Sequence, residues 1–128
     1  MNLLIDTCTF LWITKGSSKL SINAKKTFKS PDNKVFLSSI SAWEISIKFR
    51  IGKLKLPYPP GQFIPRERQR HFITPLPLSE EDTFQLAKLP DIHQNPFGRI
   101  LICQAIENGL TILTPDEFIH QYPVKTIW

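Results

Sequence analysis

Two aspartates stand where carboxylates often do chemistry. Asp6 ends a short apolar run that begins at Asn2, and Asp116 follows a second apolar run, Leu110–Thr114. If both runs are parallel strands of one α/β sheet, the two carboxylates lie beyond the carboxyl ends of the strands, where such sheets bind ligands. For either acid alone, a turn or a helix N-cap explains the position as well.

A third acid, Glu44, shares one face of the predicted helix Ile40–Ile51 with three isoleucines. A carboxylate in apolar surroundings must be paired, protonated or bound to a metal, because an isolated buried charge is strongly destabilising. Glu44 is therefore predicted either to pair with a buried Arg or Lys or to join Asp6 and Asp116 around a cation. Clustered carboxylates repel each other unless a cation lies between them. Hard oxygen ligands of this kind suit Mg²⁺ or Mn²⁺.

The elements that must position these acids alternate along the chain. Strands are predicted at Asn2–Asp6, Val35–Ser39, Ile73–Leu78, Leu110–Thr114 and Val124–Trp128. The third is expected at a sheet edge because Pro75 and Pro77 lack a backbone N–H. Helices are predicted at Thr7–Thr14, Ile22–Lys29, Ile40–Ile51, Ser79–Leu89, Gly98–Asn108 and Asp116–Gln121, with a helical turn at Arg66–His71 and loops at Leu56–Pro65 and Pro90–Phe97. This order predicts one α/β domain over residues 1–128, with a mostly parallel central sheet flanked by helices.

Composition indicates the cellular compartment and the kind of binding partner. The chain has 128 residues, enough for one hydrophobic core. No apolar run approaches the roughly 18–20 residues that cross a bilayer, so no membrane partner is expected. Cys8 and Cys103 lie in apolar segments, and the first residues do not resemble a signal peptide. Both thiols are therefore predicted to pack in the core of a reduced, cytoplasmic protein. The net charge of +5 favours an anionic partner such as nucleic acid, although a solvated basic face explains it as well.

Three segments carry four motifs in order along nearly the whole chain. They are LLIDTCTFLW from Leu3, SSISAWEISIKFRIGKL from Ser38, and NPFGRILICQAIENGLTILTPDEF from Asn95. These segments resemble the PIN-domain family, in particular the VapC-like toxin ribonucleases of type II toxin–antitoxin systems. The resemblance implies a PIN-like fold, with Asp6, Glu44 and Asp116 as catalytic acids that bind Mg²⁺ or Mn²⁺. It also implies a metal-dependent endoribonuclease toxin that acts on RNA, binds a small cognate antitoxin and forms a homodimer.

The third motif departs from the family pattern. Asn95 and Gly98 stand where the family has aspartate, and the second position is normally a metal-site acid. Asp91 is near in sequence, and its place in a predicted loop leaves open whether it replaces the missing acid. Cys8 stands where histidine is common. These departures predict a degenerate site, and they predict that Gly98→Asp tightens metal binding and raises the cleavage rate.

The departures leave three functions open. The intact acids favour a metal-dependent ribonuclease, with activity weakened by the missing acid at position 98. The alternative is a degenerate PIN domain that binds antitoxin or RNA without cleaving it. A DNA-directed nuclease is a further alternative, because metal-site acids do not distinguish the two polymers.

Basic residues near the acids are candidates for RNA binding. Lys48, Arg50 and Lys53 follow Glu44, and Arg99 follows Gly98. Such residues bind phosphates without regard to sequence. A solvated face or an acidic segment of the antitoxin explains the first three as well, and Arg99 could instead pair with an acid.

The remaining chemical side chains receive no role from spacing. His71, His93 and His120 are scattered and have no ligand spacing. Trp12 and Trp43 are predicted to pack in the core or at a dimer interface, as aromatic residues at helical spacing usually do.

Overall fold

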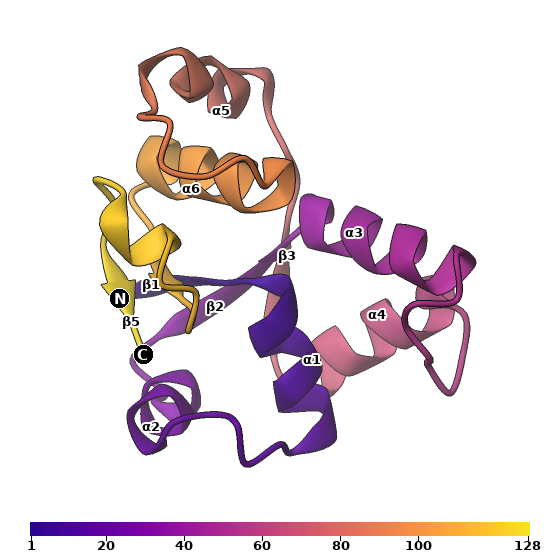
Figure 1. The fold of residues 1–128 in the computed structure, drawn as a ribbon. Coiled ribbons are helices and arrows are strands. Elements are labelled where there is room, and N and C mark those ends of the chain that lie inside the picture. The colour runs from indigo at the N-terminus through magenta and orange to yellow at the C-terminus, as the bar shows by residue number, and fades with distance from the viewer.

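The computed structural model describes residues 1–128, which form one five-stranded parallel sheet with the order β3-β2-β1-β4-β5 (Figure 1). The strands are β1 (Asn2–Ile5), β2 (Lys34–Ser38), β3 (Ile73–Leu76), β4 (Thr111–Leu113) and β5 (Thr126–Ile127). The central strand β1 pairs with β2 on one side and β4 on the other, and every pair is parallel. The predicted α/β architecture is confirmed, as is the edge position of β3.

Six α-helices and two 3₁₀ turns connect the strands and cover the sheet. The helices are α1 (Thr7–Lys15), α2 (Ile22–Lys29), α3 (Ser39–Arg50), α4 (Pro60–Arg70), α5 (Glu80–Phe84) and α6 (Pro96–Asn108). The 3₁₀ turns are η1 (Gln85–Lys88), which continues α5, and η2 (Ile119–Gln121). None of the helices is long and apolar enough to cross a membrane.

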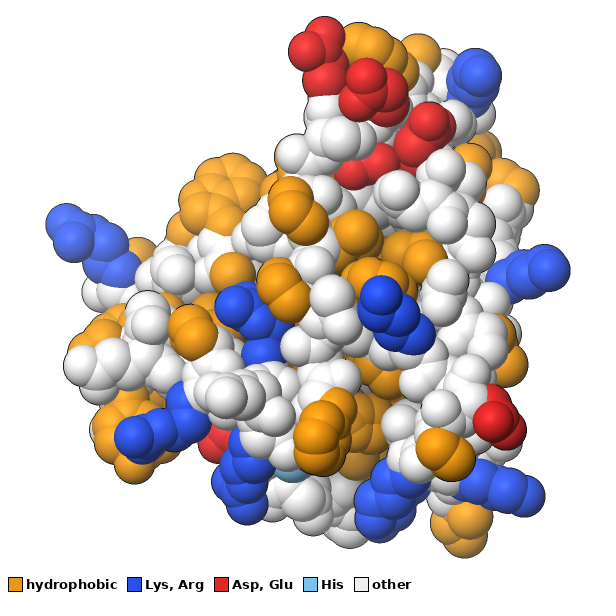
Figure 2. Space-filling view, turned by 180° about the vertical axis from the view of Figure 1, so that it is seen from behind, with side chains coloured by type: hydrophobic (Ala, Val, Ile, Leu, Met, Phe, Trp, Pro, Cys, Tyr) orange, Lys and Arg blue, Asp and Glu red, His pale blue; other side chains and the backbone are white.

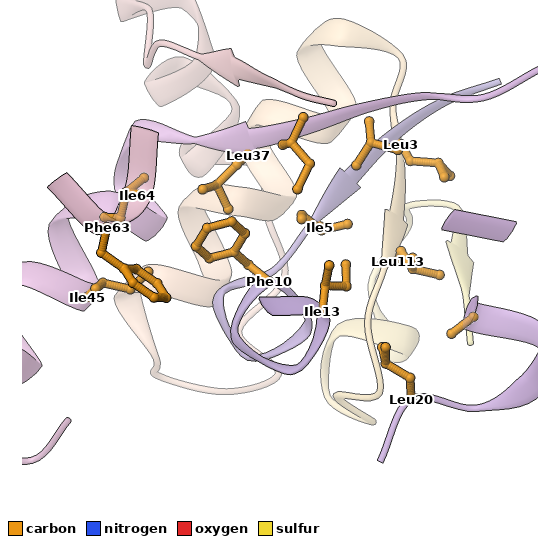
Figure 3. Packing of buried hydrophobic residues seen from close by; sticks show 13 residues of the cluster. Leu3, Ile5, Phe10, Ile13, Leu20, Leu37, Ile45, Phe63, Ile64 and Leu113 are labelled. Atoms are coloured by element: carbon orange, nitrogen blue, oxygen red, sulfur yellow. The ribbon is translucent and has the colours of Figure 1, made fainter. Parts of the chain in front are cut away.

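The pleat of β1 divides the core into two layers, because successive side chains point to opposite faces of a sheet. Leu3 and Ile5 belong to a cluster of 13 buried residues that also includes Phe10 of α1 and Phe63 of α4 (Figure 3). Leu4 belongs to a second cluster of 10 buried residues, formed largely with α6. A helix layer therefore packs on each face of the sheet, and the strand ends are held rigidly between the layers.

The prediction of a loop over Leu56–Pro65 is wrong, because α4 begins at Pro60. Proline suits the first turn of a helix, where its fixed φ is already helical and its missing N–H would have no intrahelical partner. Pro65 lies inside the same helix, next to Ile64, which is buried with Phe63. Burial of these two side chains offsets the hydrogen bond that Pro65 removes.

Two predicted boundaries also moved. Helix α6 starts at Pro96, two residues before the predicted start, because Asn95 serves as its N-cap. The predicted helix Asp116–Gln121 is reduced to the short turn η2. The first change matters for the site, because it moves Gly98 from the first to the third position of the helix.

Charge is distributed unevenly over the surface. Figure 2 shows acidic side chains gathered over one end of the molecule, whereas Lys and Arg side chains spread over the rest of that face. Helix α5 carries acids on its first turn, including Glu80 and Glu81.

Candidate functional site

A cleft of about 110 Å³ brings together the three acids that the sequence singled out. Asp6, Glu44 and Asp116 all line it, together with Asn95 and Gly98. Asp6 follows β1 and caps α1, Asp116 follows β4, and Glu44 comes from α3. The cleft therefore lies at the carboxyl ends of the two central strands, where a parallel sheet binds ligands.

Asp6 is held rigidly and is almost fully buried, with 8% of its surface exposed. Its Oδ1 accepts a hydrogen bond from the backbone N–H of Thr9 at 2.9 Å, and its Oδ2 accepts one from Thr114 Oγ1 at 2.5 Å. Burial raises the pKa of Asp6, and the nearby charge of Asp116 raises it further, against the lowering effect of these hydrogen bonds. A cation beside Asp6 would remove this penalty on its ionised form.

Thr114 links Asp6 to Asp116. Besides donating to Asp6, the Thr114 hydroxyl accepts a hydrogen bond from the backbone N–H of Asp116 at 3.0 Å. Oδ1 of Asp116 in turn accepts the backbone N–H of Phe118 at 2.8 Å, which fixes the carboxylate. Sequence reasoning assigned no role to Thr114, although its place two residues before Asp116 was a usable signal.

Glu44 is buried, and both of its oxygens have partners. Thr7 Oγ1 donates to Oε1 at 2.7 Å, and Lys48 Nζ pairs with Oε2 at 2.6 Å. The ion pair left open by the sequence is therefore present, but its cation is on the surface, with 45% of the Lys48 side chain exposed. Lys48, a predicted RNA contact, is thus already committed to Glu44.

The apolar stripe that drew attention to Glu44 is not the buried face of α3. Ile51 is 57% exposed, and the buried residues of this helix are Ser41, Glu44 and Ile45. Helix α3 packs against α1, α4 and α6, so the face between these helices is the one removed from water. Glu44 is buried as predicted, but for a different reason.

The surroundings of position 98, where the family has an acid, are set by two residues, Asn95 and His93. Asn95 Oδ1 accepts the backbone N–H groups of Phe97 and Gly98 at 3.0 and 3.4 Å, so Asn95 caps α6 without bringing a charge. A Cβ atom on Gly98 would lie 3.1 Å from Nε2 of His93. A side chain at position 98 would therefore crowd an imidazole, which spacing along the sequence did not reveal.

Asp91 does not replace the missing acid. Its side chain is 83% exposed and pairs with Arg99 Nη2 at 3.2 Å, outside the cleft. The other terminal nitrogen of Arg99 donates to the backbone oxygens of Pro90 and His93 at 3.0 and 3.2 Å. Of the two roles open to Arg99, the structure shows the pairing with an acid.

Two other predicted RNA contacts, Arg50 and Lys53, are not among the residues that line the cleft. Arg50 and Lys53 are exposed at the end of α3 and just beyond it. Trp43 is 58% exposed and meets Phe97 edge to face at 5.4 Å, so it does not pack in the core. Its expected place at an interface stays a prediction.

The two cysteines differ from each other. Cys103 is buried in the core, as predicted. The prediction that Cys8 packs in the core is wrong, because Cys8 is only half-buried and lines the cleft. Burial, together with the charge of Asp6, raises the pKa of the Cys8 thiol to about 11, so this side chain is neutral at physiological pH.

The donors of the cleft fit a hydrated divalent cation. No three Asp, Glu, His or Cys side chains stand close enough together to hold a metal ion among them. Mg²⁺ usually keeps several of its waters and is bound through only one or two carboxylates. Asp6 and Asp116 supply two such carboxylates on adjacent strand ends, and the buried position of Asp6 favours a cation nearby.

Comparisons with known proteins show the family and agree with the fold. The PIN domain family model matches residues 3–125. Ribonuclease VapC16 of Mycobacterium tuberculosis is 39% identical over 51 residues, a segment that spans 40% of this chain and 36% of that relative. The structure of VapBC2 from Rickettsia felis, bound to a DNA fragment from their promoter, superposes with a TM-score of 0.75 at 17% identity, covering 100% of this chain and 99% of that chain. VapBC-1 from nontypeable Haemophilus influenzae gives 0.66 at 16% identity, covering 99% and 97%.

Proposed function

Because this chain belongs to the PIN domain family, we propose that it is a divalent-metal-dependent endoribonuclease that serves as the toxin of a toxin–antitoxin pair. The observation that carries the proposal is the meeting of Asp6, Glu44 and Asp116 in one cleft. The matched relative is a ribonuclease, and two similar solved structures are VapBC assemblies. The proposed setting is cytoplasmic, with RNA as the substrate and a small antitoxin as the partner.

Each side chain of the cleft has a separate role in the proposed reaction. Asp6 and Asp116 would hold Mg²⁺ or Mn²⁺, with Glu44 contributing through a water molecule. When bound, such a cation polarises the scissile phosphate and lowers the pKa of an attacking water. Thr114 and the N–H of Thr9 hold the Asp6 carboxylate in one orientation. Lys48 balances the charge of Glu44, which limits the repulsion among the three acids.

Exposed basic residues are proposed to bind the rest of the RNA. Arg50 and Lys53 are exposed, and the chain carries a net charge of +5. Both side chains are proposed to contact phosphates of a bound RNA outside the cleft, an interaction that salt weakens.

A second candidate function rests on position 98. Gly98 brings no acid, and a side chain at this position would crowd His93. If Asp6, Glu44 and Asp116 are not enough to bind the metal ion, a PIN domain that lacks an acid at position 98 binds RNA or antitoxin without cutting RNA.

Cleavage assays distinguish the two functions. Purified protein is expected to cut RNA in the presence of Mn²⁺ or Mg²⁺ and to be inactive in EDTA. Asp116→Asn, which removes a proposed ligand, should be inactive with either metal. RNA that stays intact with both metals while still binding the protein would favour the degenerate domain, and cleavage that persists in EDTA would contradict the metal mechanism.

We also propose a homodimer, as the family resemblance implies. Trp43, Phe97 and Ile100 line an apolar groove of about 400 Å³ between α3 and α6, which makes this face a candidate for contact with a second copy. Light scattering should give twice the 14.8 kDa of one chain, and Trp43→Ser should shift the mass toward a single chain. A single-chain mass for the unmodified protein at high micromolar concentration would contradict this prediction.

A further inference from the structure

His93 lies against the position of the missing acid, and one of its ring nitrogens has no hydrogen-bond partner. Its Nε2 atom lies 3.1 Å from the point where a Cβ of residue 98 would stand. This nitrogen is buried and makes no hydrogen bond. Phe118, two residues after Asp116, stacks on the imidazole with ring centroids 5.3 Å apart and an interplanar angle of 10°. The ring is therefore fixed beside the cleft, on the side where the acid is lacking.

The other ring nitrogen indicates which one carries the proton. His93 Nδ1 lies 2.7 Å from Tyr122 Oη. That oxygen already accepts the backbone N–H of His93 and Arg99 Nη1–H, both at 3.1 Å. With two donors already on its oxygen, the phenol has its own O–H left to give, and two acceptors lie within reach: Nδ1 at 2.7 Å and the His93 backbone oxygen at 3.4 Å. The backbone oxygen is the more distant and already accepts Arg99 Nη1–H, so Tyr122 donates to Nδ1. The neutral imidazole then carries its proton on Nε2.

This tautomer makes Nε2 a hydrogen-bond donor and leaves it no lone pair for a metal ion. The chain of hydrogen bonds from Arg99 through Tyr122 to His93 polarises each member in the same direction, which strengthens the donor at its end. A buried donor without an acceptor is destabilising until an acceptor reaches it. The site is thus suited to an anionic oxygen at the position where relatives would place a carboxylate.

We propose that His93 is a phosphate-binding residue of this cleft, with Nε2–H donating to a phosphate oxygen of bound RNA. The proposal deepens the proposed function and rests on it, because it takes RNA as the substrate. Asn95 Cγ lies 3.9 Å from the same point, and Asn95 is exposed and lines the cleft. Gly98 also lines the cleft, so the point beside Nε2 adjoins the space that a phosphate bound in the cleft would enter. Tyr122 and Arg99 act as positioning residues that fix the tautomer.

Binding of a labelled RNA oligonucleotide, measured by fluorescence anisotropy in EDTA, tests the donor without cleavage. His93→Leu should weaken binding roughly tenfold or more, as expected for the loss of a hydrogen bond to a charged oxygen. His93→Gln, whose amide nitrogen lies near the position of Nε2, should recover much of the loss. His71→Leu, a histidine outside this cleft, is the matched control and should bind as the unmodified protein does. Equal affinity for all four proteins would overturn the proposal.

Two further measurements separate a phosphate donor from a metal ligand. Nitrogen NMR of the free protein should show the His93 proton on Nε2, and a proton on Nδ1 would overturn the proposal. Calorimetry without RNA should find the Mn²⁺ affinity of His93→Leu within about twofold of the unmodified protein, whereas a roughly tenfold loss would make His93 a ligand instead. If the unmodified protein neither binds nor cuts RNA, the proposed function fails as well. If it does both and His93→Leu behaves identically, only the role of His93 fails.

Discussion

Asp6→Asn is expected to lower RNA cleavage at least ~100-fold while making the protein more stable. Loss of a metal-binding carboxylate removes about 3 kcal/mol or more of transition-state stabilisation, and each ~1.4 kcal/mol is a factor of ten in rate. The stability change has the opposite sign because Asp6 is buried beside Asp116 and its ionised form is disfavoured. Asparagine keeps the capping oxygen for the Thr9 N–H, and its Nδ2–H can donate to Thr114 Oγ1 in place of the bond that Thr114 now donates to Asp6 Oδ2. The start of α1 is therefore preserved. A gain of roughly 1 kcal/mol corresponds to a Tm increase of about 4 °C.

The pH dependence of stability gives an independent check on Asp6. Its pKa is raised in the folded protein, so between the ordinary aspartate value and the raised value the folded state binds more protons than the unfolded state. Stability contributed by this group therefore increases as the pH falls through that window. Asp6→Asn should remove this contribution from the pH profile.

Cleavage assays and thermal unfolding, with metal and with EDTA, measure both effects. Asp32→Asn is the matched control, because Asp32 is an exposed acid that does not line the cleft, and it should change neither quantity. Added Mn²⁺ should raise the Tm of the unmodified protein and leave that of Asp6→Asn nearly unchanged. A stable Asp6→Asn protein that cuts RNA at the original rate would remove Asp6 from the site.

Restoring an acid at position 98 is expected to have a large effect only when His93 is also replaced. In Gly98→Asp alone, the new Cβ would crowd Nε2 of His93 at 3.1 Å, and the carboxylate would accept the Nε2–H. The acid would then satisfy the imidazole and contribute little to a cation. Gly98→Asp with His93→Ala frees the carboxylate and the space around it, and should tighten Mn²⁺ binding on the order of tenfold. This expectation replaces the one from the sequence, in which Gly98→Asp alone sufficed.

Calorimetry of the four proteins in this cycle, without RNA, measures the coupling between the two positions. Gly61→Asp is the control for adding an acid to the first turn of a helix, because a side chain at Gly61 of α4 meets nothing within 4 Å. It should leave Mn²⁺ affinity unchanged. A single Gly98→Asp protein that binds Mn²⁺ as tightly as the double variant would show that His93 does not obstruct this position.

The acids of the site were predictable because two of them depend only on strand order. Asp6 and Asp116 follow apolar strands, and parallel strands bring their carboxyl ends to one edge. Helix α4 was not predictable from its prolines alone, since Pro60 and Pro65 resemble a loop until the burial of Phe63 is known.

His93 was hidden for a different reason. Its partner Tyr122 lies 29 residues away in sequence. In addition, the residue beside it, Gly98, has no side chain, so its type gives no sign of a contact with His93. Positions at strand ends and on helix faces reveal groups that regular elements hold, and they miss a group that reaches a site from a loop.

The two edges of the sheet restrict how another protein can bind this chain. One edge strand, β3, contains Pro75, which has no N–H to offer, and the other, β5, is only two residues long. Short strands and proline at an edge disfavour β-augmentation, in which a partner extends a sheet by adding its own strand. An antitoxin would therefore have to recognise helix surfaces and the mouth of the cleft through side chains. Pairing between a toxin and its own antitoxin would then depend on a few side-chain contacts, and a single substitution on α3 or α6 could change partner choice without disturbing the sheet.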